Sequence, residues 1–154
     1  VMVIGAGEMS RTTAQSLLSR GARSIFVTNR SFERAEELAS ELDGEAVRFD
    51  EWQEVLCEVD VVISSTGAPH AVMERAHVEG VRRKRRYRPL FLIDIAVPRD
   101  IDPRVGEIEE VYLYDIDTLQ EIAQDAKGRR VEQIQLCETI IDQELARSGL
   151  LGRE

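Results

Sequence analysis

The sequence predicts an α/β protein with a doubly wound parallel sheet, followed by one long helix. Short apolar runs typical of strands alternate with helical patterns over residues 1–114. A glycine-containing turn joins the first apolar run to the first helical pattern. Such alternation favours parallel strands joined by right-handed crossovers, with helices on both faces of the sheet.

The first two strand–helix units open the chain. Val1–Ile4 is an apolar run that ends in glycine, and a helical pattern then continues to Gly21. Ser24–Thr28 is the second strand, Ser31 can cap the following helix, and Gly44 is a stop signal. The apolar face of that helix carries Ala35, Leu38, Ala39 and Leu42.

Weaker and stronger strands follow. Ala46–Phe49 is a weak strand, and Asp50 can cap a short helix around Trp52. Val61–Ser65 is apolar enough to be buried on both faces, as central parallel strands are. Helical pattern resumes after Pro69.

The last two strands precede a different kind of element. Leu90–Val97 predicts another central strand, and Val111–Tyr114 predicts one at the edge. From Asp115 onward apolar residues recur three to five apart, which predicts a long amphipathic helix bent near Gly128. We therefore divide the chain into a domain at 1–114 and a helix at 115–154.

Composition excludes several classes of protein. The 154 residues fit one ordinary core, and the net charge of −9 disfavours general attraction to nucleic acid. No apolar run is near the roughly 20 residues that span a bilayer, so we expect no membrane segment. Cys57 and Cys137 lie far apart and outside metal-ligand spacing, which predicts reduced thiols in a cytoplasmic protein and no metal site.

The turn after the first strand predicts a phosphate-binding site. It consists of Gly5, Ala6, Gly7, Glu8, Met9 and Ser10. Two glycines let the backbone approach a pyrophosphate at the helix N-terminus, and Ser10 is a small residue in place of the usual third glycine. A purely structural turn is the alternative, but the strand before it and the helix after it favour a Rossmann-type dinucleotide site.

The end of the second strand predicts which dinucleotide binds. An NAD-binding domain usually places an acid there for the ribose hydroxyl, whereas this sequence has Asn29, Arg30 and Ser31. A guanidinium makes charge-assisted hydrogen bonds to a 2′-phosphate, so we expect NADPH. The same observation argues against S-adenosylmethionine. The alternative is that Arg30 is a solvated surface charge.

Two further turns are expected beside the nicotinamide. Ser65, Thr66 and Gly67 follow one central strand, and Ala96, Val97 and Pro98 follow another, at the edge of the sheet where ligands bind. Any single one of these residues has an ordinary connection as its alternative role. Asp94, an acid inside an apolar strand, is expected to brace the neighbouring loop.

No catalytic residue is predicted in the chain. Cys57 and Cys137 each adjoin a glutamate, which does not favour a reactive thiolate. His70, expected at a helix start, and His77, expected on a helix surface, are poorly supported as proton-transfer groups.

Five strings together resemble the central domain of glutamyl-tRNA reductase: GAGEMS, TNRS, ISSTGAP, RPLFLIDIAVPRDIDP and VYLYDIDTL. The resemblance implies an NADPH-binding domain from about the middle third of a longer enzyme of tetrapyrrole (porphyrin) biosynthesis. In that enzyme a cysteine of a separate domain forms a thioester from glutamyl-tRNA, and NADPH reduces it to glutamate-1-semialdehyde. Because Val1 already lies within a strand, we expect a longer polypeptide here as well.

The resemblance also implies partners. Glutamyl-tRNA would bind through domains that this chain lacks, and the isolated chain would be inactive. The whole protein would be a homodimer through a region beyond the long helix, and contact with the next enzyme of the pathway is a further expectation. A basic cluster (Arg82, Arg83, Lys84, Arg85, Arg86 and Arg88) is either a solvated face or a tRNA contact.

Two other functions remain open at this point. One is the NADP-binding domain of a shikimate-dehydrogenase-like oxidoreductase, which also places Asn-Arg after the second strand. The other is a noncatalytic NADPH-sensing or assembly module that uses the long helix as its partner surface.

Overall fold

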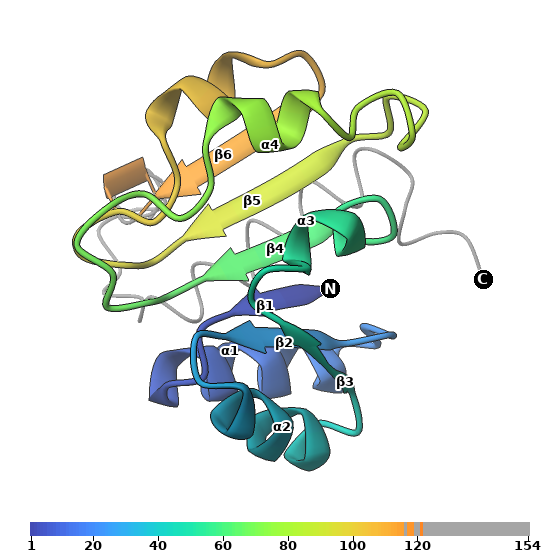
Figure 1. The fold of residues 1–154 in the computed structure, drawn as a ribbon, viewed down its shortest axis with the longest axis vertical. Helices are drawn as coiled ribbons and strands as arrows, with labels where there is room; N and C mark the ends of the chain where they lie inside the picture. Colours follow the sequence, from blue (N-terminus) through green and yellow to red (C-terminus); the bar gives the residue numbers. More distant parts are fainter. Residues whose placement is uncertain (116, 119–120, 122–154) are drawn as a thin grey trace.

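A computed structural model describes residues 1–115, 117–118 and 121 (Figure 1). Within them lies one sheet of six parallel strands in the order β3-β2-β1-β4-β5-β6. The chain starts in the middle of the sheet and extends first to one side and then to the other, which confirms the doubly wound prediction. The strands are β1 (Met2–Ile4), β2 (Phe26–Asn29), β3 (Glu45–Arg48), β4 (Val61–Ser64), β5 (Leu90–Asp94) and β6 (Val111–Asp115).

Helices cover both faces of the sheet in the described part of the chain. They are α1 (Glu8–Ser19), α2 (Phe32–Glu41), α3 (Trp52–Val55), α4 (Arg75–Glu79) and the 3-10 helix η1 (Pro103–Glu107). Neighbouring residues of a strand point to opposite faces. Val3 therefore packs with the buried residues of α1 and α2, whereas Met2 and Ile4 pack with those of α3, α4 and η1.

The predicted apolar face of α2 is confirmed. Its residues Ala35, Leu38 and Ala39 are buried against β1 and β2. The predicted cap is confirmed too, because the Ser31 hydroxyl accepts a hydrogen bond from the Arg34 N–H at 3.5 Å. Gly44 ends the unit, and its N–H donates to the Ala39 carbonyl at 2.8 Å.

Three local predictions are wrong. The N-cap of α3 is Glu51 instead of Asp50, because the chain first makes a tight turn in which the Glu51 N–H donates to the Arg48 carbonyl at 2.9 Å. The helix predicted after Pro69 starts only at Arg75, and His70 lies in a bend before it. Strand β5 ends at Asp94, three residues before the predicted end.

Both of the later errors arise from contacts with residues 100–101. The backbone N–H groups of Val72 and Met73 donate to the Asp100 carbonyl, at 2.5 Å and 3.0 Å, and Met73 forms an isolated parallel bridge with Ile101. This tertiary pairing holds the chain extended until α4 begins. The Asp94 carboxylate accepts hydrogen bonds from the Ala96 and Ile101 N–H groups, which folds the chain away from the sheet.

The predicted long helix at 115–154 lies outside the described residues except for 115, 117–118 and 121. Among the described residues, no helix has the length and apolar character needed to cross a membrane.

Candidate dinucleotide-binding site

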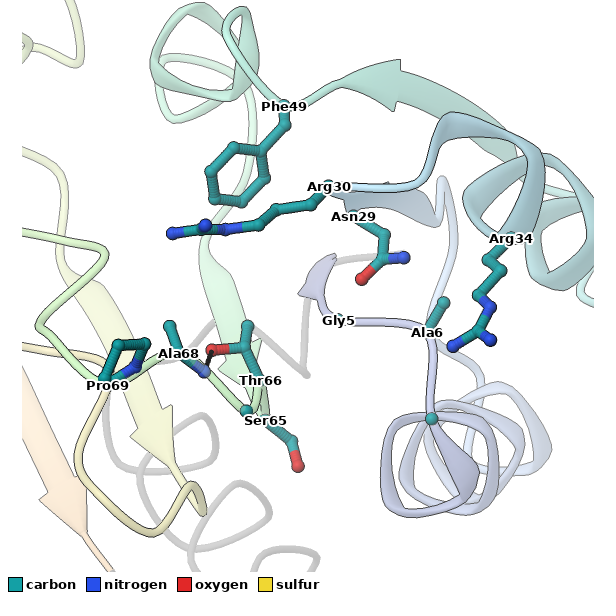
Figure 2. A pocket seen from close by; sticks show the side chains of 12 residues that line it. Gly5, Ala6, Asn29, Arg30, Arg34, Phe49, Ser65, Thr66, Ala68 and Pro69 are labelled. Atoms are coloured by element: carbon teal, nitrogen blue, oxygen red, sulfur yellow. Dashed lines mark hydrogen bonds between the residues drawn. The ribbon is translucent and has the colours of Figure 1, made fainter.

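A cleft of about 360 Å³ lies at the carboxyl ends of β1, β2 and β4 (Figure 2). The sheet order changes direction between β1 and β4, and open parallel sheets bind ligands at that point. The cleft is lined by Gly5, Ala6, Gly7, Asn29, Arg30, Arg34, Phe49, Ser65, Thr66, Gly67, Ala68 and Pro69. It therefore brings together the turn after β1, the end of β2 and the turn after β4.

Gly5 holds two of these turns against each other. Its φ of +105° is unfavourable for any other residue, and a Cβ at this position would overlap the Ser65 carbonyl oxygen. The Gly5 N–H donates to the Thr28 carbonyl at 2.8 Å, and the Ser65 N–H donates to the Ile4 carbonyl at 2.9 Å. Glycine is thus required at position 5 by both conformation and space.

Gly7 leaves room for a ligand. A Cβ built on Gly7 would meet no atom within 4 Å. Gly7 is also the N-cap of the twelve-residue helix α1, and no side chain caps that end. The unpaired N–H groups and partial positive charge of a helix N-terminus attract phosphate, so this turn fits a pyrophosphate.

The other three residues of the predicted turn do not line the cleft. Glu8 is exposed and pairs with Arg11 at 2.8 Å. Met9 packs with the cluster around Leu17. Ser10 is fully buried, and its hydroxyl is among the buried polar groups without a hydrogen-bond partner. The cofactor contacts proposed for these three residues remain predictions. For Ser10, the structure shows a small side chain that packs next to Gly5.

The end of β2 supplies cationic groups. The guanidinium carbon of Arg30 lies 5.6 Å from the centre of the Phe49 ring, and Figure 2 shows Arg30 extending along that ring across the cleft. The Asn29 amide donates to the Ser31 carbonyl at 3.2 Å and so fixes the turn into α2. Ser31 itself caps the helix and does not line the cleft.

Sequence reasoning missed Arg34 and Phe49. Arg34 lies in the first turn of α2 and points toward the turn at Ala6 (Figure 2). Arg34 follows the Ser31 cap by about one helical turn, which brings it to the same end of the helix as Arg30. That spacing is the signal that could have identified it. Phe49 follows β3, and its position depends on strand pairing that the sequence alone does not give.

The turn after β4 forms the opposite wall of the cleft. Ser65 and Thr66 are half-buried, whereas Gly67 is exposed. The Thr66 hydroxyl and N–H both bond to the carboxylate of Asp100, a fully buried acid that sequence reasoning also missed. Its burial among polar partners depends on contacts with residues more than thirty positions away.

Ala96, Val97 and Pro98 line a separate hollow of about 220 Å³ together with Arg99 and Asp117. It follows β5, so it lies at the same edge of the sheet as the cleft. The Val97–Pro98 peptide is cis, and Val97 is 80% exposed.

The expectation that Asp94 braces its loop is confirmed. Its carboxylate accepts hydrogen bonds from Ala96 N–H at 3.1 Å and Ile101 N–H at 2.8 Å. Burial raises the pKa of the Asp94 carboxyl above its usual value, although these N–H donors oppose the shift.

Two of the candidate proton-transfer and nucleophilic groups, Cys57 and His77, do not line the cleft. Cys57 and His77 line a third hollow with α3 and α4. His77 stacks edge-on against Trp52, and its Nδ1 accepts the Glu74 N–H at 2.9 Å. Among the described residues that line the cleft, none is a cysteine, histidine, lysine or acid. The described residues contain no metal-binding cluster, and Cys137 lies outside them.

The structure divides the predicted basic cluster. Arg85 is 2% exposed, and its guanidinium donates to the carbonyls of Leu56, Val59, Arg88 and Pro89. Burial lowers the pKa of Arg85, and the nearby Arg88 charge acts in the same direction. Arg83, Lys84 and Arg86 remain exposed.

A glycine turn at the switch point of an open parallel sheet, with cationic groups after the second strand, defines a Rossmann-type dinucleotide-binding domain. Residues 1–122 match the family described as Shikimate / quinate 5-dehydrogenase, and the chain belongs to that family.

The chain is also similar to proteins named glutamyl-tRNA reductase. Glutamyl-tRNA reductase from Akkermansia muciniphila is 50% identical over 147 residues, which are 96% of this chain and 43% of that protein. The enzyme from Geobacter sulfurreducens is 47% identical over 145 residues, 94% of this chain and 33% of that protein. A solved structure of glutamyl-tRNA reductase from Methanopyrus kandleri is 48% identical with a TM-score of 0.76, covering 95% of this chain and 37% of that one. The chain thus spans less than half the length of these relatives.

Proposed function

We propose that this chain is the NADPH-binding domain of a glutamyl-tRNA reductase, which reduces glutamyl-tRNA to glutamate-1-semialdehyde in tetrapyrrole biosynthesis. The observation that carries the proposal is identity of 47–50% to glutamyl-tRNA reductases along 94–96% of the chain. The family match covers residues 1–122, which include every turn that lines the cleft.

Each part of the cleft has a role in this proposal. Gly5, Ala6 and Gly7, with the first N–H groups of α1, would hold the pyrophosphate. Arg30 and Arg34 would bind the 2′-phosphate, because two guanidinium groups at the end of β2 match its charge. The Ser65–Gly67 turn would contact the nicotinamide half, with Ala96, Val97 and Pro98 as a second wall.

The chemistry is divided between this chain and the rest of the protein. When bound, NADPH supplies hydride to an activated glutamyl carbonyl. The side chains that line the cleft orient the cofactor, and none of them is a nucleophile of the thioester-forming kind. We therefore place the nucleophilic cysteine, tRNA binding and homodimerisation in a longer polypeptide, together with contact to the next enzyme. The chain alone should bind NADPH without turning over glutamyl-tRNA.

Two alternatives make different predictions. A shikimate-dehydrogenase-like enzyme is supported by the family match and would oxidise a cyclic alcohol with NADP. A noncatalytic NADPH-sensing module would bind the cofactor and reduce neither substrate. Assays of the full-length polypeptide with glutamyl-tRNA and with shikimate separate all three.

Cofactor preference is tested by calorimetric titration of the chain with NADPH and NADH. We expect NADPH to bind about tenfold to a hundredfold more tightly, because a hydrogen bond to a charged group contributes about 1.5–3 kcal/mol. Arg30→Ala and Arg34→Ala should each reduce that preference.

Arg48→Ala is the matched control. Arg48 lies at the end of β3 over the Phe32 ring and does not line the cleft, so its loss should leave the preference unchanged. Equal affinity for the two cofactors in the unmodified chain would contradict the proposal.

A further inference from the structure

Asp100 connects three segments of the chain at the carboxyl edge of the sheet. Its side chain is fully buried and accepts hydrogen bonds from Ser64 Oγ at 2.7 Å, Thr66 N–H at 2.8 Å and Thr66 Oγ1 at 2.5 Å. Its own carbonyl accepts the N–H groups of Val72 and Met73. Each donor belongs to the end of β4, to the cleft-lining turn or to the segment before α4.

The Thr66 hydroxyl is already committed to the protein. It donates its single proton to Asp100 and accepts the Ala68 N–H at 3.1 Å, an interaction drawn as a dashed line in Figure 2. The Thr66 N–H also points to Asp100. A hydroxyl has one proton to donate, so Thr66 has none left for a ligand although it lines the cleft.

Ser65 is in the opposite situation. It is half-buried on the cleft wall, and among the described residues its hydroxyl has no hydrogen-bond partner. Its backbone is fixed on one side by the Ser65 N–H to Ile4 bond and on the other by the bonds from Thr66 to Asp100. The Ser65 hydroxyl is therefore held at the cleft with its hydrogen-bonding capacity unused.

Asp100 also connects this turn to the second expected wall of the nicotinamide end. Residue 101, its neighbour, donates to Asp94, which also accepts the Ala96 N–H. The loop that carries Ala96, Val97 and Pro98 is thus fixed at both ends by buried carboxylates. A shift of Asp100 would move the Ser65 turn and this loop relative to one another.

We propose that Asp100 is a positioning residue for the nicotinamide half of the cofactor, and that Ser65, held in place through it, is the hydroxyl of this turn that binds the ligand. The inference rests on the proposed dinucleotide function of the cleft. It assigns Thr66 a structural role, in contrast to the direct cofactor contact that its sequence position predicted.

The test compares two ligands, NADPH and adenosine 2′,5′-bisphosphate, by calorimetry on the same chain. The second ligand carries the adenosine and 2′-phosphate but no nicotinamide. Asp100→Asn and Thr66→Val should each weaken NADPH binding about tenfold, the effect expected when the displaced Ser65 hydroxyl loses one hydrogen bond to the ligand. Both should leave binding of the bisphosphate within about twofold, because Arg30 and Arg34 lie on the other wall.

Three further variants sharpen the test. Ser65→Ala should weaken NADPH binding by a similar factor. Thr66→Ser, unlike Thr66→Val, should bind NADPH as the unmodified chain does, because it keeps the hydroxyl that bonds Asp100. Combining Asp100→Asn with Thr66→Val should cost little more than either alone, since both remove the same hydrogen bond. Asp102→Asn is the control: this nearby acid caps η1 and pairs with Arg104, so neither ligand should be affected.

The outcomes are separable. Equal weakening of both ligands by Thr66→Val, which keeps the shape of threonine, would mean general loss of structure and would overturn the inference. Unchanged NADPH binding in Ser65→Ala would also overturn it. If the unmodified chain binds the bisphosphate but gains nothing from the nicotinamide half, this inference fails while the proposed function stands. If it binds neither ligand, the proposed function itself fails.

Discussion

At the scale of single residues, the basic run at 82–88 demonstrates how little a charge pattern says about burial. Five of its cations lie at the surface to differing degrees, and Arg85 is inside the core. Arg85 follows the buried Val78 and Val81 at helical spacing, but its charge predicts an exposed position. Its burial depends on carbonyls of Leu56 and Val59, which are more than 25 positions earlier.

Arg85→Ala should therefore destabilise the fold strongly. The substitution leaves several carbonyls without donors and opens a cavity, so we expect a loss of about 3 kcal/mol or more in the free energy of unfolding. Arg83→Ala, an exposed change in the same loop, should stay within about 0.5 kcal/mol. Urea denaturation of both variants measures the difference, and equal midpoints would show that the Arg85 contacts contribute nothing.

Gly5 and Gly7 form a second contrast between residues of the same type. Gly5→Ala should cost about 1 kcal/mol or more, because alanine is unfavourable at positive φ and its Cβ would meet Ser65. Gly7→Ala should cost less stability than Gly5→Ala, because nothing surrounds its Cβ and only the N-cap preference for glycine over alanine is lost. It should nevertheless weaken NADPH binding by filling the space expected for phosphate. Thermal unfolding and titration together test the pair. If the Gly7→Ala chain keeps its full affinity for NADPH, the pyrophosphate does not bind at this turn.

At the scale of elements, helices and strands were predicted where a periodic pattern decides them. The buried runs of β1, β4 and β5 and the apolar stripe of α2 are such patterns. Errors arose where a long-range contact overrides the local pattern. The segment after Pro69 is drawn into an extended path by Asp100, and β5 is cut short by the side chain of Asp94.

Two substitutions of Ser31 separate its role as the cap of helix α2 from its expected position near the 2′-phosphate. Ser31→Ala should lower the free energy of unfolding by about 1 kcal/mol, because the cap bond to Arg34 is lost. Ser31→Asp should keep the cap and the stability, but it places a carboxylate beside the expected 2′-phosphate. NADPH should then lose affinity relative to NADH. Unchanged preference in Ser31→Asp would mean that the phosphate does not lie near this helix.

At the scale of the whole molecule, fold class and topology were predictable, and the composition of the site was predictable only in part. Gly5, Gly7, Asn29, Arg30 and the Ser65–Gly67 turn were identified because local motifs carry them. Arg34, Phe49 and Asp100 were not, since each joins the site through packing between separate segments. The predicted contacts of Glu8, Met9, Ser10 and Ser31 stay predictions.

The charge distribution of the molecule allows one further prediction. The exposed Arg83, Lys84 and Arg86 precede β5, so they lie at the amino edge of the sheet, opposite the cleft. If these cations contact tRNA, replacing all three by alanine in the full-length protein should weaken tRNA binding. The slope of the logarithm of the binding constant against the logarithm of the salt concentration should also become shallower by about two to three.

NADPH affinity should not change in this triple variant, because the cleft is at the other edge of the sheet. Arg23→Ala serves as a control for the general effect of losing an exposed positive charge. Unchanged tRNA affinity and an unchanged salt slope would mean that these side chains face solvent and do not contact tRNA.

The contact between Gly5 and the Ser65 carbonyl restricts how this site can mutate. A side chain at position 5 is opposed twice, once by its own backbone angle and once by a neighbouring turn. A compensating substitution in that turn would relieve the second obstacle and leave the first. In a genetic selection that begins from Gly5→Ala, we therefore expect survivors to be true revertants to glycine, with second-site suppressors rare or absent.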